Sequence, residues 1–191
     1  MQTKKEAVIT LSIVVAIALL VSGYTYFVHY KNKHKADDVP SALDDFLRSD
    51  DDYSYTDIDG NRIYLDNFTG SILVVNSWAS WSPASAEELN KLGHFSEKYP
   101  ESSVKFLAIN RADRSALAKQ FIKKFAIPNT VMLVLDPEDR YYNLINGYNM
   151  PETVIYNQDG QVIKHIRGEI DFVLLEQIIK EQLAAESVPL D

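Results

Sequence analysis

The sequence predicts an α/β domain with a central mixed sheet flanked by helices and an N-terminal β-hairpin extension, preceded by one membrane-crossing helix. Two observations support this architecture. From residue 53 onward, short apolar runs typical of strands alternate with helical patterns. Ahead of that region, residues 7–28 carry no charge. The 191 residues therefore divide into a short N-terminal segment (1–6), a transmembrane helix (7–28), a polar tether (29–52), a folded domain (53–186) and a C-terminal tail (187–191).

The transmembrane prediction rests on the length of the uncharged run. Its 22 residues suffice for an α-helix to cross about 30 Å of hydrocarbon, which makes the lipid bilayer a predicted partner. A cleavable signal peptide is the alternative, but its apolar core usually spans only about 7 to 15 residues, and no small-x-small cleavage site follows. The run ends instead in an aromatic cluster, typical of a retained helix that meets the membrane interface: Tyr24, Tyr26, Phe27 and Tyr30.

The charges beside this helix do not settle its orientation. Lys4 and Lys5 precede the run, whereas three lysines between residues 31 and 35 follow it. By the positive-inside rule, this near balance leans slightly toward a cytoplasmic C-terminus.

The net charge differs in sign between the N-terminal 35 residues and the rest of the chain. Residues 1–35 hold five lysines and one glutamate, which leaves 14 basic and 26 acidic residues in the rest, a net charge of −12. Phosphate neutralisation needs clustered Lys and Arg, so nucleic acid is not a predicted partner.

The polar tether either forms one short helix over residues 41–48 or is partly disordered.

The elements of the domain follow from local patterns in chain order. Strands 53–57 and 62–65 flank an Asp59-Gly60 turn and form the hairpin. Further strands are predicted at 72–77, 104–110, 131–135, 153–156 and 162–167, and helices at 84–99, 114–125, 139–145 and 172–185. Asp171 is placed to cap the last helix. The early parallel crossovers should be right-handed, and a second hairpin at 153–167 supplies antiparallel strands.

The most informative motif lies between the strand at 72–77 and the helix that follows it. It reads Trp-Ala-Ser-Trp-Ser-Pro-Ala-Ser over residues 78–85, and the whole chain has no cysteine. The segment resembles the active-site loop of the membrane-anchored, thioredoxin-like TlpA/ResA proteins, also grouped with the AhpC/TSA redoxins, in which the loop reads W-A-S-W-C-x-x-C. Ser82 and Ser85 stand at the two cysteine positions.

The resemblance extends over most of residues 53–186. The segment from Asp59 to Gly70 is similar to the family's entry into its first central strand, although Ser71 replaces the usual lysine. Met150-Pro151-Glu152-Thr153 matches the x-P-x-T segment, which would make Pro151 a cis-proline facing the loop; a trans proline opening an edge strand is the alternative. Glu88 matches a family glutamate near the cysteines, although Asn90 stands where a proline is expected, and an exposed helical glutamate is the alternative.

The resemblance implies a thioredoxin-like fold, a domain outside the cytoplasmic membrane and thiol-disulfide oxidoreductase activity. The absence of cysteine contradicts the implied oxidoreductase activity for this sequence. A cysteine at a helix N-terminus has a lowered pKa and reacts as a thiolate. A serine hydroxyl stays protonated at neutral pH without a partner base and forms no mixed disulfide. We therefore assign no catalytic residue, no metal ligand and no cofactor.

A hydrolytic role for the serines lacks a general base in the sequence. His94 follows on the same predicted helix, about 18 Å away at 1.5 Å per residue. The other three histidines flank the membrane segment or lie in a late strand, where surface or packing roles are expected. The serines are instead expected to cap the helix, either as the pair Ser82-Pro83 or through a capping box that begins at Ser85.

What remains of the site is a surface that could bind a polypeptide. Its predicted members are Trp81, Met150, Pro151 and Glu88, because the backbone beside such a cis-proline can pair with an extended strand. Trp78 ends a buried strand and is expected in the core, whereas Trp81 is compatible with exposure or burial. The leading hypothesis is a membrane-tethered, non-catalytic binding or assembly module. The alternatives are a TlpA/ResA-type oxidoreductase whose cysteines have both been exchanged for serine, and a structural subunit of a membrane complex.

Overall fold

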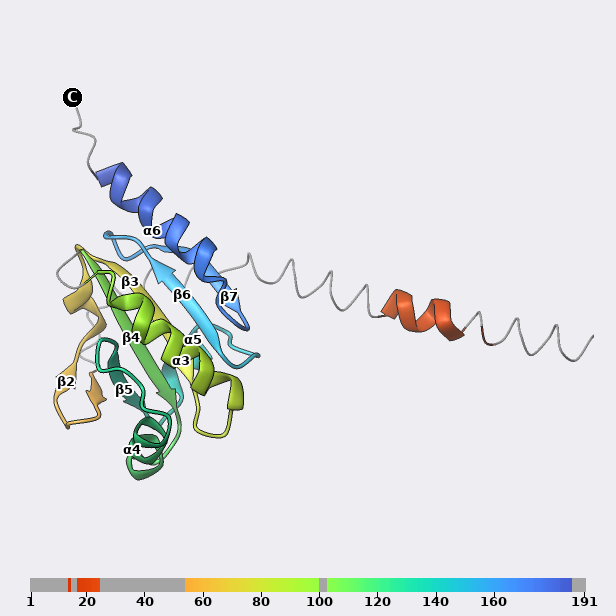
Figure 1. Ribbon diagram of the computed structural model, residues 1–191, viewed down its shortest axis with the longest axis horizontal. Helices are drawn as coiled ribbons and strands as arrows, with labels where there is room; N and C mark the ends of the chain where they lie inside the picture. The colour runs from red at the N-terminus through yellow and green to blue at the C-terminus, as the bar shows by residue number, and fades with distance from the viewer. Residues whose placement is uncertain (1–13, 15–16, 25–53, 100–102, 187–191) are drawn as a thin grey trace, which may run out of the picture. The chain divides into compact units, whose positions relative to one another are not determined.

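The computed structural model describes residues 14, 17–24, 54–99 and 103–186. The chain separates into two compact units, residues 1–38 and 39–191. Residues 17–24 are helical (Figure 1). The predicted transmembrane helix over 7–28 falls mostly outside the described residues, as do the tether at 29–52 and the tail at 187–191. Within the described part of the chain, no helix combines the length and apolar character that membrane crossing requires.

The second unit contains a seven-stranded mixed sheet in the order β2-β1-β5-β4-β3-β6-β7 (Figure 1). β3, β4 and β5 pair in parallel, and all other pairs are antiparallel. The predicted hairpin at the start and the predicted hairpin at 153–167 are both confirmed. The strands are β1 (Tyr55–Asp57), β2 (Arg62–Ile63), β3 (Ile72–Trp78), β4 (Val104–Arg111), β5 (Met132–Asp136), β6 (Glu152–Tyr156) and β7 (Val162–Arg167).

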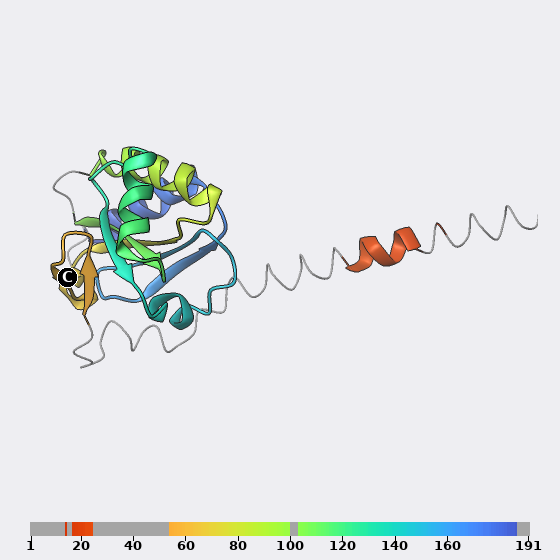
Figure 2. The same cartoon turned by 90° about the horizontal axis from the view of Figure 1, so that it is seen from below.

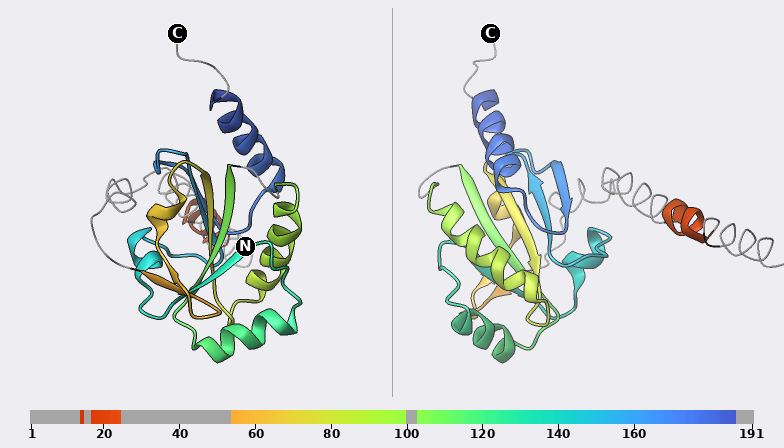
Figure 3. Two further views of the ribbon diagram at one scale, coloured as in Figure 1. Left: turned by 90° about the vertical axis from the view of Figure 1, so that its left-hand side faces the viewer. Right: turned by 45° about the vertical axis from the view of Figure 1, so that its right-hand side comes forward.

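Helices cover both faces of this sheet. They are α3 (Pro83–Ser96), α4 (Ser115–Lys124), α5 (Arg140–Leu144) and α6 (Phe172–Glu186), with a 3-10 helix η1 (Leu65–Phe68). Figure 2 shows α3, α4 and α6 on one side of the sheet and α5 on the other, and the left view of Figure 3 shows the same division. This is the thioredoxin-like α/β arrangement that the sequence predicts.

Each face of the sheet has its own apolar core, because strand side chains alternate between the two faces. Ile72 and Val74 of β3 pack with apolar residues of α3, α4 and α6. Leu73 and Val75 point the other way, into a cluster that includes Tyr141 and Tyr142 of α5. All seven residues of β3 are buried. The central strand therefore fixes the position of the loop that follows it.

Several predicted boundaries differ from the observed ones by a few residues, and two of these differences have a local reason. Leu65 does not extend the hairpin strand but begins η1, in which Asn67 N–H donates to Tyr64 O and closes a tight turn. The helix expected to reach residue 99 ends at Ser96. Its last amides bond three residues back, Lys98 to Phe95 and Tyr99 to Ser96, so the final turn is 3-10-like rather than α-helical. Asp171 caps α6 as predicted, accepting from the amides of Val173 and Leu174.

Candidate functional site

The motif loop lies where β3 meets α3, at the edge of the sheet where the parallel strands end. Ser82 is the N-cap residue of α3 and Pro83 is its first residue, a position that suits proline because its missing amide has no helical partner. The loop is also held from the side. Ser80 donates to Asp113 through both its amide and its hydroxyl, at 2.7 and 2.8 Å, and Asn110 donates to the same carboxylate at 2.8 Å.

The two serines at the cysteine positions are buried, with 5% of Ser82 and none of Ser85 exposed. The capping prediction is half wrong. Ser82 is the N-cap residue, but its hydroxyl makes no capping hydrogen bond. Ser85 does not begin a capping box, because it lies inside the first turn and its Oγ accepts from the Ala79 amide at 3.4 Å. Within residues 54–99 and 103–186, neither hydroxyl hydrogen-bonds a histidine, so the structure offers no activated serine.

The two tryptophans of the loop have opposite environments. Trp78 is fully buried, as expected, and its ring lies 5.1 Å from that of Phe121 in α4. Trp81 is 63% exposed, with the Arg111 guanidinium 6.0 Å from its ring centroid. An exposed tryptophan at the mouth of a site is unusual for a soluble surface and is typical of binding hot spots.

Pro151 follows a cis peptide bond, as predicted. The register brings this proline to the motif loop, because Ser77 of β3 pairs with Glu152 of β6 and the next residues along each strand leave the sheet at the same edge. Met150 is half-buried and Pro151 is buried. Of the predicted surface residues, Trp81 is exposed, Met150 is partly exposed and Pro151 is buried.

Glu152 holds the cis-proline turn in place from beneath. This fully buried carboxylate accepts from the amides of Tyr148 and Asn149 at 2.8 and 2.6 Å. Its other oxygen is 2.7 Å from His165 Nε2 and accepts from Arg167 at 3.2 Å. Four polar partners thus compensate for burial of the carboxylate.

Glu88 is buried, with 3% exposed, so the alternative of an exposed helical glutamate is wrong. Burial raises the pKa of Glu88 from its ordinary 4.5 to about 7, while two donors oppose this shift. Asn76 Nδ2 donates to Oε1 and the Ile170 amide donates to Oε2, each at 2.6 Å. Glu88 is therefore buried rather than exposed for contact, and it links α3 to β3 and to the segment before α6.

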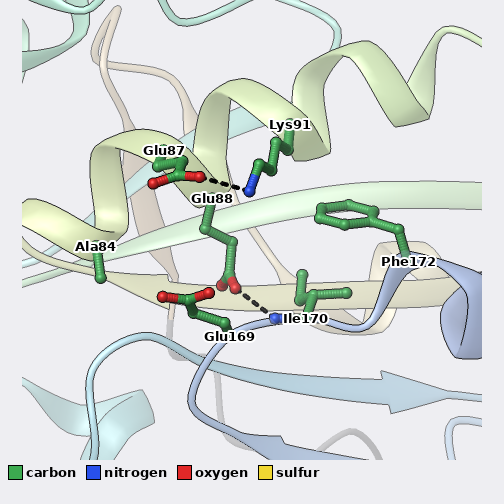
Figure 4. Close-up of a pocket in the computed structure, with 7 residues that line it drawn as sticks. All are labelled: Ala84, Glu87, Glu88, Lys91, Glu169, Ile170 and Phe172. Carbon is green, nitrogen blue, oxygen red and sulfur yellow. Dashed lines mark hydrogen bonds and ion pairs between the residues drawn. The ribbon is translucent and has the colours of Figure 1, made fainter.

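A small recess opens beside Glu88. Figure 4 shows Glu88 pointing toward Ile170, with the Glu87–Lys91 ion pair on the outer side of α3. The volume of the recess is about 10 Å³, close to the space of one water molecule. Although Glu87, Glu88 and Glu169 all border it, no group of metal-ligating side chains occurs among the described residues.

Comparison with known proteins agrees with this geometry. A family model described as Redoxin matches residues 28–177, well over half of the chain. The chain belongs to the Redoxin family. Similar proteins include "Thiol-disulfide oxidoreductase ResA" of Bacillus thuringiensis subsp. konkukian, 24% identical over 181 residues that cover 93% of this chain and 98% of the relative. The protein of the same name from Geobacillus kaustophilus is 23% identical over 165 residues, covering 86% and 90%.

Solved structures share the fold. The structure of MTB dsbF has a TM-score of 0.62 at 20% identity and covers 75% of this chain and 98% of its own. StoA from Bacillus subtilis gives 0.57 at 23% identity, with 65% and 93% covered. At these identities the likeness establishes the fold and not the activity. This redoxin is a distant ResA homologue that has kept the fold and has no cysteine.

Sequence reasoning found the loop and the cis-proline but missed what holds them. Asp113 reaches the loop from the segment between β4 and α4, and His165 and Arg167 reach Glu152 from β7, so only the folded chain brings these residues to the site. One local signal was available for Glu152. A glutamate at the first position of a buried central strand requires a partner, and the neighbouring strand carries a histidine and an arginine in alternation.

Proposed function

We propose that this redoxin is a membrane-tethered, non-catalytic module that binds a protein or peptide at the surface formed by Trp81, Met150 and Pro151, with its domain on the extracytoplasmic side. One observation carries the proposal: the site has kept its scaffold and an exposed tryptophan while oxygen replaces sulfur at both reactive positions. Serine cannot form or exchange disulfides. The remaining capacity of such a surface is recognition, through an aromatic anchor and the backbone beside the proline.

Site-specific photo-crosslinking in membranes tests this function. The full chain carries benzoylphenylalanine at Leu117, an exposed residue beside the motif loop, and Val173 of α6 serves as the control position because 79% of it is exposed. We expect a discrete crosslinked product from position 117, absent from position 173 and lost when Trp81→Ala is introduced. A product that survives Trp81→Ala, or no product from 117, contradicts the proposal.

The membrane tether needs its own measurement. The uncharged run at 7–28 supports a retained anchor. After alkaline carbonate extraction of membranes, the full chain should stay in the pellet, and a protease added outside intact cells should reach the domain. Release by carbonate contradicts the anchor, and protection from the protease contradicts the extracytoplasmic placement.

A second candidate is a ResA-type thiol-disulfide oxidoreductase whose two cysteines were exchanged for serine. The names of the relatives favour it, as does the position of the two serines, with Ser82 at the N-cap and Ser85 in the first turn of α3. Sequencing of the encoding gene separates the two. Serine codons at positions 82 and 85 support the binding module, and cysteine codons support the oxidoreductase.

A further inference from the structure

A groove runs between the motif loop and the outer face of α4. Its volume is about 390 Å³, and its lining includes Trp81, Pro83, Leu117, Phe121, Lys124 and Phe125. We call this the α4 groove. It shares Trp81 with the contact surface proposed above and adds side chains of α4 and of Phe125, which follows that helix.

The walls of the α4 groove are unusually apolar for an exposed site. Trp81 is 63% exposed, Leu117 48% and Phe125 38%. On the same helix, Ala118 and Phe121 already supply the core contacts of α4. Phe125 packs against Phe121, with ring centroids 4.7 Å apart, and still leaves 38% of its surface exposed. A contiguous exposed apolar group of this kind marks an interaction site.

The charge of α4 and its two flanking residues has the opposite sign to the net charge of the domain. Residues 114–125 contain four basic residues and no acidic one: Arg114, Lys119, Lys123 and Lys124. Residues 36–191 as a whole carry a net charge of −12. Lys124 lines the groove, and Arg114 is the N-cap residue of α4, three residues before Leu117 in the chain.

These four cations are not neutralised by a described carboxylate, and Lys124 Nζ lies 4.9 Å from the centroid of the Phe125 ring at the groove. In the structurally described stretches 54–99 and 103–186, none of the four forms an ion pair with a carboxylate, in contrast to Arg111, which pairs with Asp139. Unpaired charges that rim an apolar groove favour a ligand of the opposite charge, because complementary potentials speed association and reject partners of like charge.

The shape and charge select among negatively charged ligands. Nucleic acid and anionic bilayers present extended arrays of phosphate, which the acidic remainder of the domain would repel. A single segment of polypeptide needs only a few cations and can insert an apolar side chain into the groove. A second copy of this domain would bring a net charge of −12 over residues 36–191, which would repel the acidic remainder of the first copy.

We propose that the α4 groove binds an acidic segment of a partner protein, with a large apolar side chain seated among Trp81, Leu117 and Phe125 and carboxylates facing Lys124 and Arg114. This inference rests on the proposed binding function and adds the chemical class of the partner. It also assigns α4, rather than the cis-proline turn alone, to recognition.

Fluorescence anisotropy with the full chain and four matched peptide probes tests the proposal. Each probe has eight residues. Three carry a central Phe-Leu pair flanked by acidic, basic or uncharged polar residues, and the fourth has acidic flanks around a Gly-Gly pair. We expect the acidic Phe-Leu probe to bind at least about tenfold more tightly than the basic and the Gly-Gly probes, with an affinity that falls as salt rises.

Charge reversal on the groove provides the matched comparison. The double variant Arg114→Glu/Lys124→Glu should lose the preference for the acidic probe or invert it. Arg62→Glu/Lys105→Glu changes the net charge equally at exposed positions outside the groove and should keep the preference. Far-UV circular dichroism of both variants checks that they fold.

The outcomes separate this inference from the function on which it rests. Equal binding of acidic and basic probes, unchanged preference in the groove variant, or no binding of the acidic probe at about 1 mM overturns the acidic-segment proposal. The crosslinking result from position 117 tests the binding function independently of these peptide probes. If that crosslink joins residues 29–52 of the same chain, or a second copy, the partner assigned here is wrong.

Discussion

At the residue scale, the buried carboxyl of Glu88 makes the stability of the domain depend on pH. Because burial raises the folded-state pKa to about 7 from an ordinary 4.5, folding favours the protonated form. The stabilisation is complete below pH 4.5 and is lost as the pH rises toward 7. The size of this loss is on the order of 3 kcal/mol.

Glu88→Gln should remove that dependence. In urea denaturation from pH 4.5 to 8, the free energy of unfolding of the parent should fall relative to that of the variant across this window. Glu87→Gln is the control, because Glu87 is exposed and pairs with Lys91 on the solvent side, and its profile should follow the parent. Parallel profiles for Glu88→Gln and the parent would contradict a raised pKa in the folded domain.

Glu152 is expected to be the most costly residue of the site to remove. Glu152→Ala removes the acceptor of two amides, the carboxylate partner of His165 and one of the two acceptors of Arg167. Loss of one partner from such a buried network costs about 3–5 kcal/mol. Thermal and urea unfolding should show this loss, whereas Glu138→Ala, at an exposed position, should change stability by less than about 0.5 kcal/mol. A small effect at residue 152 would mean that the turn does not depend on its carboxylate.

The residues of the site differ in how far the sequence reveals them. Pro151 and the serine positions follow from short motifs, so their places were predicted correctly. Burial of Glu88 was not, because a glutamate in a helix gives no local sign of which side it faces. Its two donors come from Asn76 and Ile170, twelve residues before it and 82 after it in the chain. Only the folded topology brings such partners together.

At the element scale, α3 depends on close approach to the loop before β5. A Cβ on Gly93 would lie 2.6 to 2.8 Å from three ring atoms of Pro128, closer than van der Waals contact, and a proline ring cannot rotate away. Elsewhere on a helix, Gly to Ala gains up to about 1 kcal/mol. Here Gly93→Ala should destabilise the domain by about 1 to 3 kcal/mol through overpacking.

Chemical denaturation of Gly93→Ala beside His94→Ala checks this contact. His94 is the next residue of α3 and points to solvent, with 64% of its side chain exposed. Its replacement should leave the midpoint nearly unchanged. Stabilisation by Gly93→Ala would show that helix propensity outweighs the contact and that α3 can shift.

Elements were predicted more reliably than their ends. The strands and helices of residues 54–186 all occur in the predicted order, because period-two and helical patterns extend over whole elements. Their boundaries depend on single hydrogen bonds, such as those that end α3 in a 3-10-like turn. The exposed apolar residues of α4 were also hidden, since a helical pattern of apolar residues does not say which ones exceed the needs of the core.

At the scale of the whole molecule, the protein combines a thioredoxin-like fold with serine at both cysteine positions. Replacing both serines with cysteine tests whether the fold still supports a redox site. Residues three apart in a first helical turn have Cβ atoms about 5–6 Å apart, a spacing that small adjustments bring within disulfide range. Ser82→Cys/Ser85→Cys should therefore oxidise to an intramolecular disulfide, and the helix N-terminus should favour the thiolate of the first cysteine. Mass spectrometry after mild oxidation should show loss of two hydrogens in the double variant, while each single variant stays a monomeric thiol or forms only intermolecular disulfides.

Insulin reduction by dithiothreitol then links the restored pair to activity. The parent should not accelerate precipitation above buffer, because it has no sulfur at residues 82 and 85, whereas the double variant should. If the parent turns over insulin at a rate comparable to a thioredoxin, the non-catalytic function is wrong. If the double variant fails to oxidise, the loop has not retained the geometry of a redox site, and the oxidoreductase alternative loses its structural support while the binding surface at Trp81 remains.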